Sequence, residues 1–257
     1  MSAYLELAHL TRDDVAALAP DSVLVLPTAA TEQHGPHLPL GTDSLLGEAV
    51  ARQSLSITES ETRFVLAPVM QYGSSHHHLI YGALSLSTAT FLSSVTDVLL
   101  SAVLSGFRRL YVLNSHGGNV ECVRLASRDV SQAHDVVIGS CSYWDVSRPA
   151  IPSATLQGTA PVPGHAGQFE TSLMLAVSPE LVRLDRLPVG SRDAPIQAAE
   201  GRTGSVVHEH GAWQRSGGYT DVPTEPSAEL GQLLLRVIAE SVAAELTAFD
   251  ALSRGAA

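Results

Sequence analysis

Four short, almost continuous apolar runs are spaced along the chain, at residues 22–27, 63–67, 109–113 and 136–140. Runs of this length without polar alternation are typical of strands that are buried on both faces. Between them lie longer segments in which apolar residues recur every three or four positions, the period of a helix that covers a core with one face. Strands that alternate with helices predict a parallel or mixed sheet with helices on both sides.

The predicted helices begin and end at recognisable capping residues. Thr11 is an expected N-cap with the acidic Asp14 three positions on, and Pro20 ends the short helix that follows. Gly106 is the expected C-cap of a helix over residues 88–105. The remaining predicted helices share the periodic pattern and cover residues 43–55, 120–134, 167–177 and 228–252.

Three segments lack any such period, at residues 71–82, 147–164 and 185–229. The second is rich in Pro, Ser, Thr and Gly, which predicts a long surface loop or flap. We do not expect it to be a domain linker, because residues on both sides of it are needed for one site. The 257 residues are therefore predicted to form a single α/β domain over 1–257.

Polar side chains gather where the predicted strands end. Glu32, His34 and Asp43 follow the first strand, and His116 follows the third. Because ligands bind beyond the carboxyl ends of the strands in open α/β sheets, we expect these side chains at one site. The pair Gly117–Gly118 lets the backbone pass close to a bound ion or substrate.

Carboxylates and imidazoles at such an edge favour a divalent-metal site. His165 and Glu170, at the start of a later predicted helix, are expected to complete it. Two ions held by shared carboxylates lower the pKa of a water molecule, which is the chemistry of a two-metal hydrolase. Taken singly, each residue is more simply a solvated carboxylate or a structural histidine. Their joint position at strand ends, beside Gly and Pro, favours ligands.

Two further groups have more than one interpretation. His76–His78 form a triple-histidine loop, which is more often solvated or at an interface than catalytic, and His77 is the candidate substrate contact within it. Tyr143 and Trp144 follow the fourth strand. A tryptophan at such a place either packs in the core or forms a pocket wall, so both aromatic residues are candidate substrate contacts.

Composition excludes several classes of partner. The formal net charge is −11 and no Lys/Arg cluster is visible, so no nucleic-acid partner is expected. The longest apolar stretch, residues 98–107, is too short to span a bilayer, so a soluble protein is expected. Two cysteines are too few for a disulfide framework, which predicts a reduced, cytoplasmic setting.

Three motifs together resemble the creatininase (creatinine amidohydrolase) family. They are residues 31–43 (TEQHGPHLPLGTD), 114–119 (NSHGGN) and 164–172 (GHAGQFETS), and they occur in the family's order. Weaker landmarks at residues 72–73 and 224–231 extend the resemblance over nearly the whole chain. It implies a three-layer α/β/α sandwich with a mostly parallel central sheet. It also implies a homohexamer with two divalent ions per chain, commonly Zn²⁺, with Mn²⁺ or Fe²⁺ in some members.

The resemblance implies roles for individual residues as well. In creatininase proper, a glutamate two positions beyond the equivalent of His116 binds metal, but this chain has Gly118 there. The family branch with this Gly-Gly pair draws its carboxylate from the later motif, which assigns Glu170 as a metal ligand or a general base. His165 is implied as the catalytic proton shuttle to the leaving nitrogen. The implied metal ligands, with Asp43 as the bridge, are Glu32, His34, Asp43, His116 and Glu170.

The departures from the family bear on the substrate. Creatininase proper closes tryptophan-bearing segments over creatinine, whereas residues 158–164 here contain no aromatic side chain. We therefore predict a hydrolase of a C–N amide bond in another small cyclic amide, a lactam or a formamide. One alternative is a metallopeptidase that trims a short peptide, as a relative acting on the mycofactocin precursor does. The other is a non-catalytic binding relative. A nucleotide substrate is disfavoured because the motif loops contain no Arg or Lys.

Overall fold

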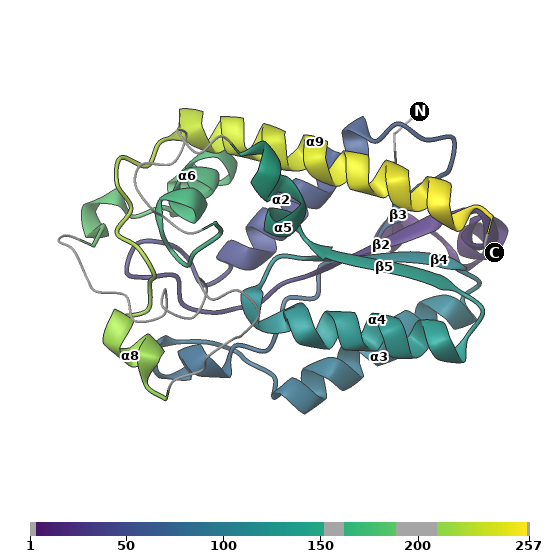
Figure 1. The fold of residues 1–257 in the computed structure, drawn as a ribbon, viewed down its shortest axis with the longest axis horizontal. Helices are drawn as coiled ribbons and strands as arrows, with labels where there is room; N and C mark the ends of the chain where they lie inside the picture. Colours follow the sequence, from purple (N-terminus) through teal and green to yellow (C-terminus); the bar gives the residue numbers. More distant parts are fainter. Residues whose placement is uncertain (1–3, 152–161, 189–209, 256–257) are drawn as a thin grey trace.

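The computed structural model describes residues 4–151, 162–188 and 210–255, and its centre is a sheet of five parallel strands in the order β1-β3-β2-β4-β5 (Figure 1). Four of these strands confirm the predicted apolar runs. The first was not predicted, because three residues at a sheet edge are too few to show a period. The strands are β1 (Tyr4–Glu6), β2 (Val23–Thr28), β3 (Phe64–Leu66), β4 (Arg109–Asn114) and β5 (Val137–Ser142).

Helices cover both faces of the sheet, which confirms the predicted three-layer α/β/α architecture. On one face lie α2 (Thr42–Ile57), α5 (Tyr143–Ser147), α6 (Gln168–Val177) and α9 (Ala228–Ser253). On the other face lie α3 (Thr88–Leu104) and α4 (Val120–Ala133) (Figure 1). Along β2 the side chains alternate between the two cores. Val23 and Val25 pack with α2, α6 and α9, while Leu24 and Leu26 pack with α3 and α4.

The ends of the helices follow local side-chain chemistry. Thr11 and Asp14 form the predicted capping box at the start of α1 (Arg12–Leu18), and Ser227 caps α9 by accepting a hydrogen bond from the Leu230 amide. Two short helices were not predicted: α5, which continues directly from β5, and α8 (Ala212–Ser216), which lies in the unpatterned stretch. Short 3₁₀ turns occupy Leu7–His9, Ala19–Asp21, His76–Tyr81, Gly117–Asn119, Arg148–Ala150, Pro179–Leu181 and Leu184–Arg186.

The order of the strands places the site. β3 lies on one side of β2 in the sheet, and β4 lies on the other side. The loops that follow the neighbouring strands β2 and β4 therefore run in opposite directions and leave a crevice at the carboxyl ends of these strands. Thr28 pairs with Asn114 at this edge, and the Thr28 hydroxyl donates to Asn114 Oδ1 at 3.1 Å. Such a crevice is where ligands bind in open α/β sheets.

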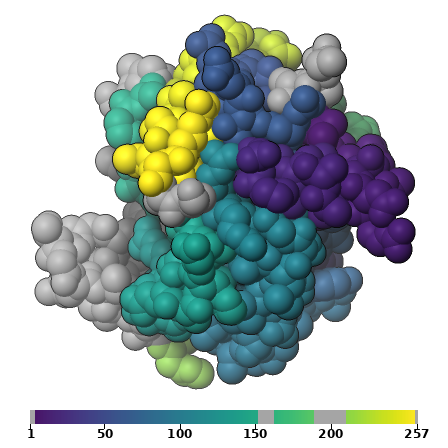
Figure 2. Space-filling view, turned by 90° about the vertical axis from the view of Figure 1, so that its right-hand side faces the viewer, coloured from purple at the N-terminus to yellow at the C-terminus, as the bar shows by residue number. Residues whose placement is uncertain are grey.

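The end of the sheet at which the strands begin lies opposite the crevice and faces the viewer in Figure 2. The C-terminal turns of α9 and the N-terminal segment lie on this face. A cavity of about 940 Å³ is lined by residues that include Arg63, Arg108, Arg109 and Arg254. Arg109 is paired with the buried Asp250 at 2.9 Å. No helix in the described part of the chain is long and apolar enough to cross a membrane.

Candidate metal centre

The loop after β2 brings two carboxylates and an imidazole into the crevice. The loop turns back on itself at Gly35, whose φ of +64° suits glycine, and the Glu32 amide donates to the Leu40 carbonyl at 2.9 Å. Asp43 follows in the first turn of α2, where the helix dipole favours a negative charge. Glu32 and His34 are fully buried, and Asp43 is 3% exposed. Buried charges of this kind need a counter-charge.

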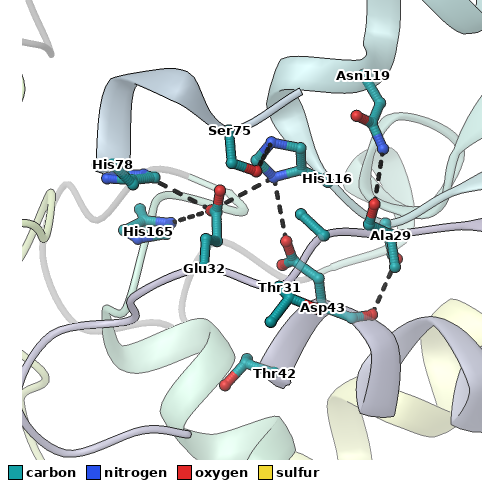
Figure 3. Close-up of polar contacts among 12 residues, drawn as sticks. Ala29, Thr31, Glu32, Thr42, Asp43, Ser75, His78, His116, Asn119 and His165 are labelled. Carbon is teal, nitrogen blue, oxygen red and sulfur yellow. Dashed lines mark hydrogen bonds and ion pairs between the residues drawn. The ribbon is translucent and has the colours of Figure 1, made fainter. Parts of the chain in front are cut away.

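His116 reaches the same carboxylates from the end of β4. Its Nδ1 lies 3.1 Å from Asp43 Oδ2 and 3.3 Å from Glu32 Oε1 (Figure 3). Its Nε2 is 3.2 Å from the carbonyl oxygen of Ser74, which can only accept a hydrogen bond. The proton of the neutral ring therefore belongs on Nε2, and Nδ1 presents its lone pair to the carboxylates.

His34 and Glu170 form a second group on the other side of Asp43. His34 Nε2 lies 3.1 Å from Asp43 Oδ1 and 3.9 Å from Glu170 Oε2. Glu170 stands in the first turn of α6, where it accepts a hydrogen bond from the Ala166 amide at 2.6 Å. His34 Nδ1 is 3.1 Å from the Glu32 carbonyl oxygen, so here too the far nitrogen carries the proton and the near one faces the carboxylates.

The two carboxylate oxygens of Asp43 thus point to different groups of side chains. Oδ2 lies 3.1 Å from His116 Nδ1, which also faces Glu32, and Oδ1 lies 3.1 Å from His34 Nε2, which also faces Glu170. The ligand atoms of His34, Asp43 and Glu170 all lie within 4.8 Å of one another, and so do those of Glu32, His77 and His116. A carboxylate with an imidazole on each side is the arrangement that shares a ligand between two ions.

Unpaired buried oxygens show that the donor set fits divalent cations. Both oxygens of Glu32 and Oδ2 of Asp43 are buried and have no hydrogen-bond partner among the described residues. A buried anionic oxygen without a partner is strongly unfavourable, and a coordinated cation removes that penalty. Mixed oxygen and nitrogen donors suit Zn²⁺ and also Mn²⁺ or Fe²⁺.

The pKa shifts in the cluster indicate the same need for positive charge near the carboxylates. Burial alone would lower the pKa of His34, but the neighbouring Asp43 and Glu170 outweigh it and raise that pKa to about 10. Burial likewise opposes the proton on His116, yet Glu32 and Asp43 raise the pKa of His116 well above its ordinary value. Burial is the main cause that raises the pKa of the Glu170 carboxyl to about 8. Without metal, a proton on His34 supplies part of this positive charge.

Four aromatic rings lie over the Glu32 side of the cluster. His165 stacks on His78 with ring centroids 4.5 Å apart, and Trp213 of α8 meets His78 edge-on at 4.4 Å. His77 completes the group, with its centroid 5.2 Å from that of Trp213. His165 Nδ1 and His78 Nε2 lie 3.7 and 3.6 Å from Glu32 Oε1 (Figure 3). These rings present nitrogen atoms to any molecule that approaches the carboxylate.

Tyr143 and Trp144 have a different position from the other predicted site residues. Both lie in α5 and belong to the apolar core, with exposed fractions of 1% and 6%. Burial is the main cause that raises the pKa of Tyr143 well above its ordinary value, and the charges of Glu170 and Asp43 add to it. The Tyr143 ring thus lies near the carboxylates from the core side, and contact of either residue with substrate stays a prediction. Residues 152–161 of the predicted flap lie outside the described residues.

Sequence reasoning missed three residues of this site. Gln33 lies between two motif residues to which ligand roles were assigned, and its own position in the first motif was the available signal. His78 was only one of three consecutive histidines, and nothing in the sequence distinguishes it. Trp213 lies in the stretch without periodicity. Only the fold brings it to the site.

The fold and the site define a class of protein: a three-layer α/β/α protein with a buried carboxylate–imidazole cluster at the carboxyl edge of a parallel sheet. A family model described as creatininase (creatinine amidohydrolase) matches residues 8–246, and the chain belongs to this family of amidohydrolases.

Curated relatives and solved structures agree with the family. The mycofactocin precursor peptide peptidase of Mycobacterium tuberculosis is 31% identical over 247 residues, 92% of this chain and 89% of the relative. The creatinine amidohydrolase of Pseudomonas putida is 37% identical over 187 residues, 66% of this chain and 69% of the relative. A creatininase crystal structure superimposes with a TM-score of 0.77 at 31% identity, covering 95% of this chain and 96% of its own. Creatininase structures described as Mn and Zn-Zn forms both have a TM-score of 0.74, at 30% and 29% identity, each covering 95% of this chain and 97% of its own.

Proposed function

We propose that this protein is a binuclear divalent-metal-dependent hydrolase that cleaves a C–N amide bond in a small cyclic amide, a lactam or a formamide. The observation that carries the proposal is Asp43, whose two oxygens face two separate groups of donors. The unpaired oxygens of Glu32 add to it. One ion would be held by Glu32, Asp43 and His116, and the other by His34, Asp43 and Glu170.

Divalent ions at these positions would lower the pKa of a water molecule and polarise a carbonyl oxygen. Zn²⁺ is our first choice, and Mn²⁺ or Fe²⁺ the alternatives. Glu170 is assigned as a ligand, because its Oε2 lies on the same side of Asp43 as His34 Nε2. This ligand takes the place of the glutamate that Gly118 does not provide. If Glu170 is not a ligand, it is a candidate general base.

His165 is proposed to move the proton. Its Nε2 lies 2.8 Å from the backbone carbonyl oxygen of Gln33, which requires the proton of the neutral ring on that nitrogen. The bare Nδ1 faces the carboxylate of Glu32. His165 Nδ1 would accept the proton of the attacking water as the C–O bond forms. It would then deliver this proton to the leaving nitrogen as the C–N bond breaks.

A metallopeptidase acting on a short peptide is the second candidate function. The mycofactocin precursor peptide peptidase matches 92% of the chain, more than the creatinine amidohydrolase does. Against it stands the close cover of Trp213 and His77 over the cluster, which favours a small substrate. The third candidate is a non-catalytic relative that binds a ligand or a partner. It would require that these side chains do not hold two ions.

The test measures metal content and hydrolysis together. Untagged protein would be assayed by plasma mass spectrometry and against creatinine, 2-pyrrolidone, hydantoin, N-formylglycine and a short peptide. We expect about two divalent ions per chain, turnover of at least one small amide, and loss of both ions and turnover in Glu32→Gln and Glu170→Gln. The exposed Glu121→Gln on α4 is the matched control. Turnover of the peptide alone would establish the peptidase, and less than one ion per chain would favour the binding relative.

We also propose the setting and the assembly that the family resemblance implies. Cys122 and Cys141 are both free thiols, which suits a reduced, cytoplasmic compartment. A homohexamer is the proposed assembly, because apolar side chains beside the metal centre are exposed, among them Leu79, Ile80 and Leu84.

A further inference from the structure

Gln33 lies between His78 and His165, two of the three imidazoles that face the carboxylate of Glu32, and its side chain contacts both. Its Nε2 is 2.9 Å from His78 Nδ1 and 3.0 Å from His165 Nε2. This nitrogen has two protons but three neighbours, the third being the Gly218 carbonyl, so it cannot donate a hydrogen bond to all of them. The hydrogen bonds around Gln33 therefore decide which nitrogen of each imidazole carries its proton.

The orientation of the Gln33 amide follows from two backbone contacts. Its Oε1 accepts the Gly35 amide at 2.9 Å, and its Nε2 donates to the Gly218 carbonyl at 2.8 Å. A flipped amide would set oxygen against a carbonyl and NH₂ against an N–H, so this orientation is required. Gly218 also has a φ of +85°, and a Cβ there would lie 2.5 Å from Gln33 Oε1. The close approach of the two residues keeps the amide in place.

His165 cannot accept the remaining Gln33 proton. Its Nε2 lies 2.8 Å from the backbone carbonyl oxygen of Gln33, which accepts only, so this nitrogen is already the donor. The bare Nδ1 of His165 is left to face Glu32 Oε1 at 3.7 Å. In this tautomer His165 presents a base to the site.

His78 is held in the opposite tautomer. The second Gln33 proton has only His78 Nδ1 as its acceptor, at 2.9 Å, so that nitrogen carries no proton. The proton of the neutral ring is then on Nε2. That atom is buried without a hydrogen-bond partner among the described residues, 3.6 Å from Glu32 Oε1. An unpartnered donor aimed at a reaction site is available to a substrate acceptor.

We propose that Gln33 is a positioning residue that sets His165 and His78 in opposite tautomers, and that His78 Nε2–H is a catalytic donor to the carbonyl oxygen of the amide substrate. This inference rests on the proposed amide hydrolysis. The two rings stack at 4.5 Å with planes 17° apart, so one bare nitrogen and one N–H face the same space. A planar amide offers a matching carbonyl oxygen and nitrogen to that pair.

The two imidazoles then divide the work of the reaction. As water adds to the carbonyl carbon, negative charge grows on the carbonyl oxygen, and His78 Nε2–H stabilises it by a hydrogen bond. His165 Nδ1 takes the proton from the attacking water and returns it to the leaving nitrogen. His78 keeps its proton throughout. The products are a carboxylic acid and an amine, and transfer of the acid's proton to the amine gives a carboxylate and an ammonium group.

Neutron diffraction of the deuterated, metal-loaded protein tests the tautomers without relying on activity. We expect deuterium on Nε2 of both His78 and His165 and none on either Nδ1. In Gln33→Glu, which replaces the donor by an acceptor, deuterium should move to His78 Nδ1. Gln33→Met serves as an uncharged second variant, in which His78 should no longer favour one tautomer. Deuterium on His78 Nδ1 in the unaltered protein would overturn the proposal.

The role at the substrate oxygen is tested with 2-pyrrolidone as the probe. In crystals soaked with this lactam, its carbonyl oxygen should lie about 3 Å from His78 Nε2. His78→Gln keeps an N–H near the position of Nε2, whereas His78→Asn places one near Nδ1. We expect His78→Asn to lower kcat about 10²- to 10³-fold with little change in KM, and His78→Gln to lose about tenfold or less.

Two results separate this proposal from the proposed function. If no amide is turned over although both ions bind, amide hydrolysis fails, while the neutron map and the 2-pyrrolidone position still decide the arrangement of Gln33 and His78. Equal losses in His78→Asn and His78→Gln, with unchanged metal content, would reject the donor role of His78 even in an active amidohydrolase.

Discussion

Gly118 illustrates how much one residue decides at this site. A Cβ at this position would overlap the Ser74 carbonyl and lie 2.6 Å from His116 Nε2, whereas one at the neighbouring Gly117 would meet nothing within 4 Å. No larger residue fits without moving the His116 imidazole. The absence of a carboxylate here is therefore built into the packing, which supports Glu170 as its replacement.

Gly118→Ala should displace His116 and reduce the metal content. The overlap involves backbone at Ser74, which relaxes poorly, so we also expect a loss of roughly 1–3 kcal/mol in the free energy of unfolding. Metal content by plasma mass spectrometry and urea unfolding of the metal-free protein measure the two effects. Gly117→Ala is the matched control and should change neither. Full metal occupancy in Gly118→Ala would contradict this account.

Metal binding should release protons. The pKa of His34 is raised to about 10, so this imidazole is protonated in the metal-free protein at pH 7.5, and the pKa of His116 is shifted in the same direction. The pKa of the Glu170 carboxyl is raised to about 8, so this group also holds a proton there. An ion must displace these protons, so metal affinity should rise as the pH rises toward the pKa of His34, about 10. It should fall at lower pH, where protons compete for the same atoms. Calorimetric titration in two buffers of different ionisation enthalpy should show roughly two to three protons released per chain. A buffer-independent heat would refute it.

At the scale of elements, the packing of α9 on α6 depends on one small residue. A Cβ on Gly231 would overlap the carbonyl of Ser172 in α6 and lie 2.9 Å from the Cβ of Ala176. α6 also carries Glu170 in its first turn. The distance between the two helices is thus linked to the position of a predicted metal ligand.

Gly231→Ala should destabilise the protein although alanine favours helix. The gain in helix propensity is at most about 1 kcal/mol, while forcing backbone apart costs roughly 1–3 kcal/mol. We expect a lower urea midpoint with an unchanged slope. Gly255→Ala, just beyond α9 and with nothing within 4 Å of its added Cβ, is the control. Equal midpoints for both variants would show that α6 and α9 adjust without cost.

At the scale of the whole molecule, exposed apolar side chains lie on the segment around His78 of the candidate metal centre. Leu79 is 55%, Ile80 63% and Leu84 60% exposed. Leu79 and Ile80 lie in the turn that carries His78, and Leu84 follows it. A single exposed leucine is unremarkable, but a group of this kind marks an interaction site. The proposed hexamer would cover it.

Ile80→Asp combined with Leu84→Asp should dissociate the hexamer. A carboxylate at a desolvated interface is strongly unfavourable, so sedimentation should show particles smaller than six chains. Leu104→Asp is the control, since Leu104 is 85% exposed at the end of α3 and should leave the assembly unchanged. A monomeric unaltered protein would contradict the predicted hexamer.

The sequence by itself determined the layers of the fold and which residues meet at its edge. Buried strands have apolar runs, and covering helices have a period of about 3.6 residues. Polar side chains that follow parallel strands lie together, because the carboxyl ends of the strands are at the same end of the sheet. These local signals predicted β2 to β5, α1 to α4, α6 and α9, and they named Glu32, His34, Asp43, His116, His165 and Glu170, which the fold brings together.

Only the tertiary structure decided the rest. It made β1 a strand through pairing with β3, brought Trp213 over the cluster from an unpatterned stretch, and gave His78 a place that its two histidine neighbours lack. It also gave Gln33 its partners, one of which, Gly218, is 185 positions away along the chain. Hydrogen bonds and close approaches between distant segments depend on three-dimensional register, and no local pattern of residues encodes them.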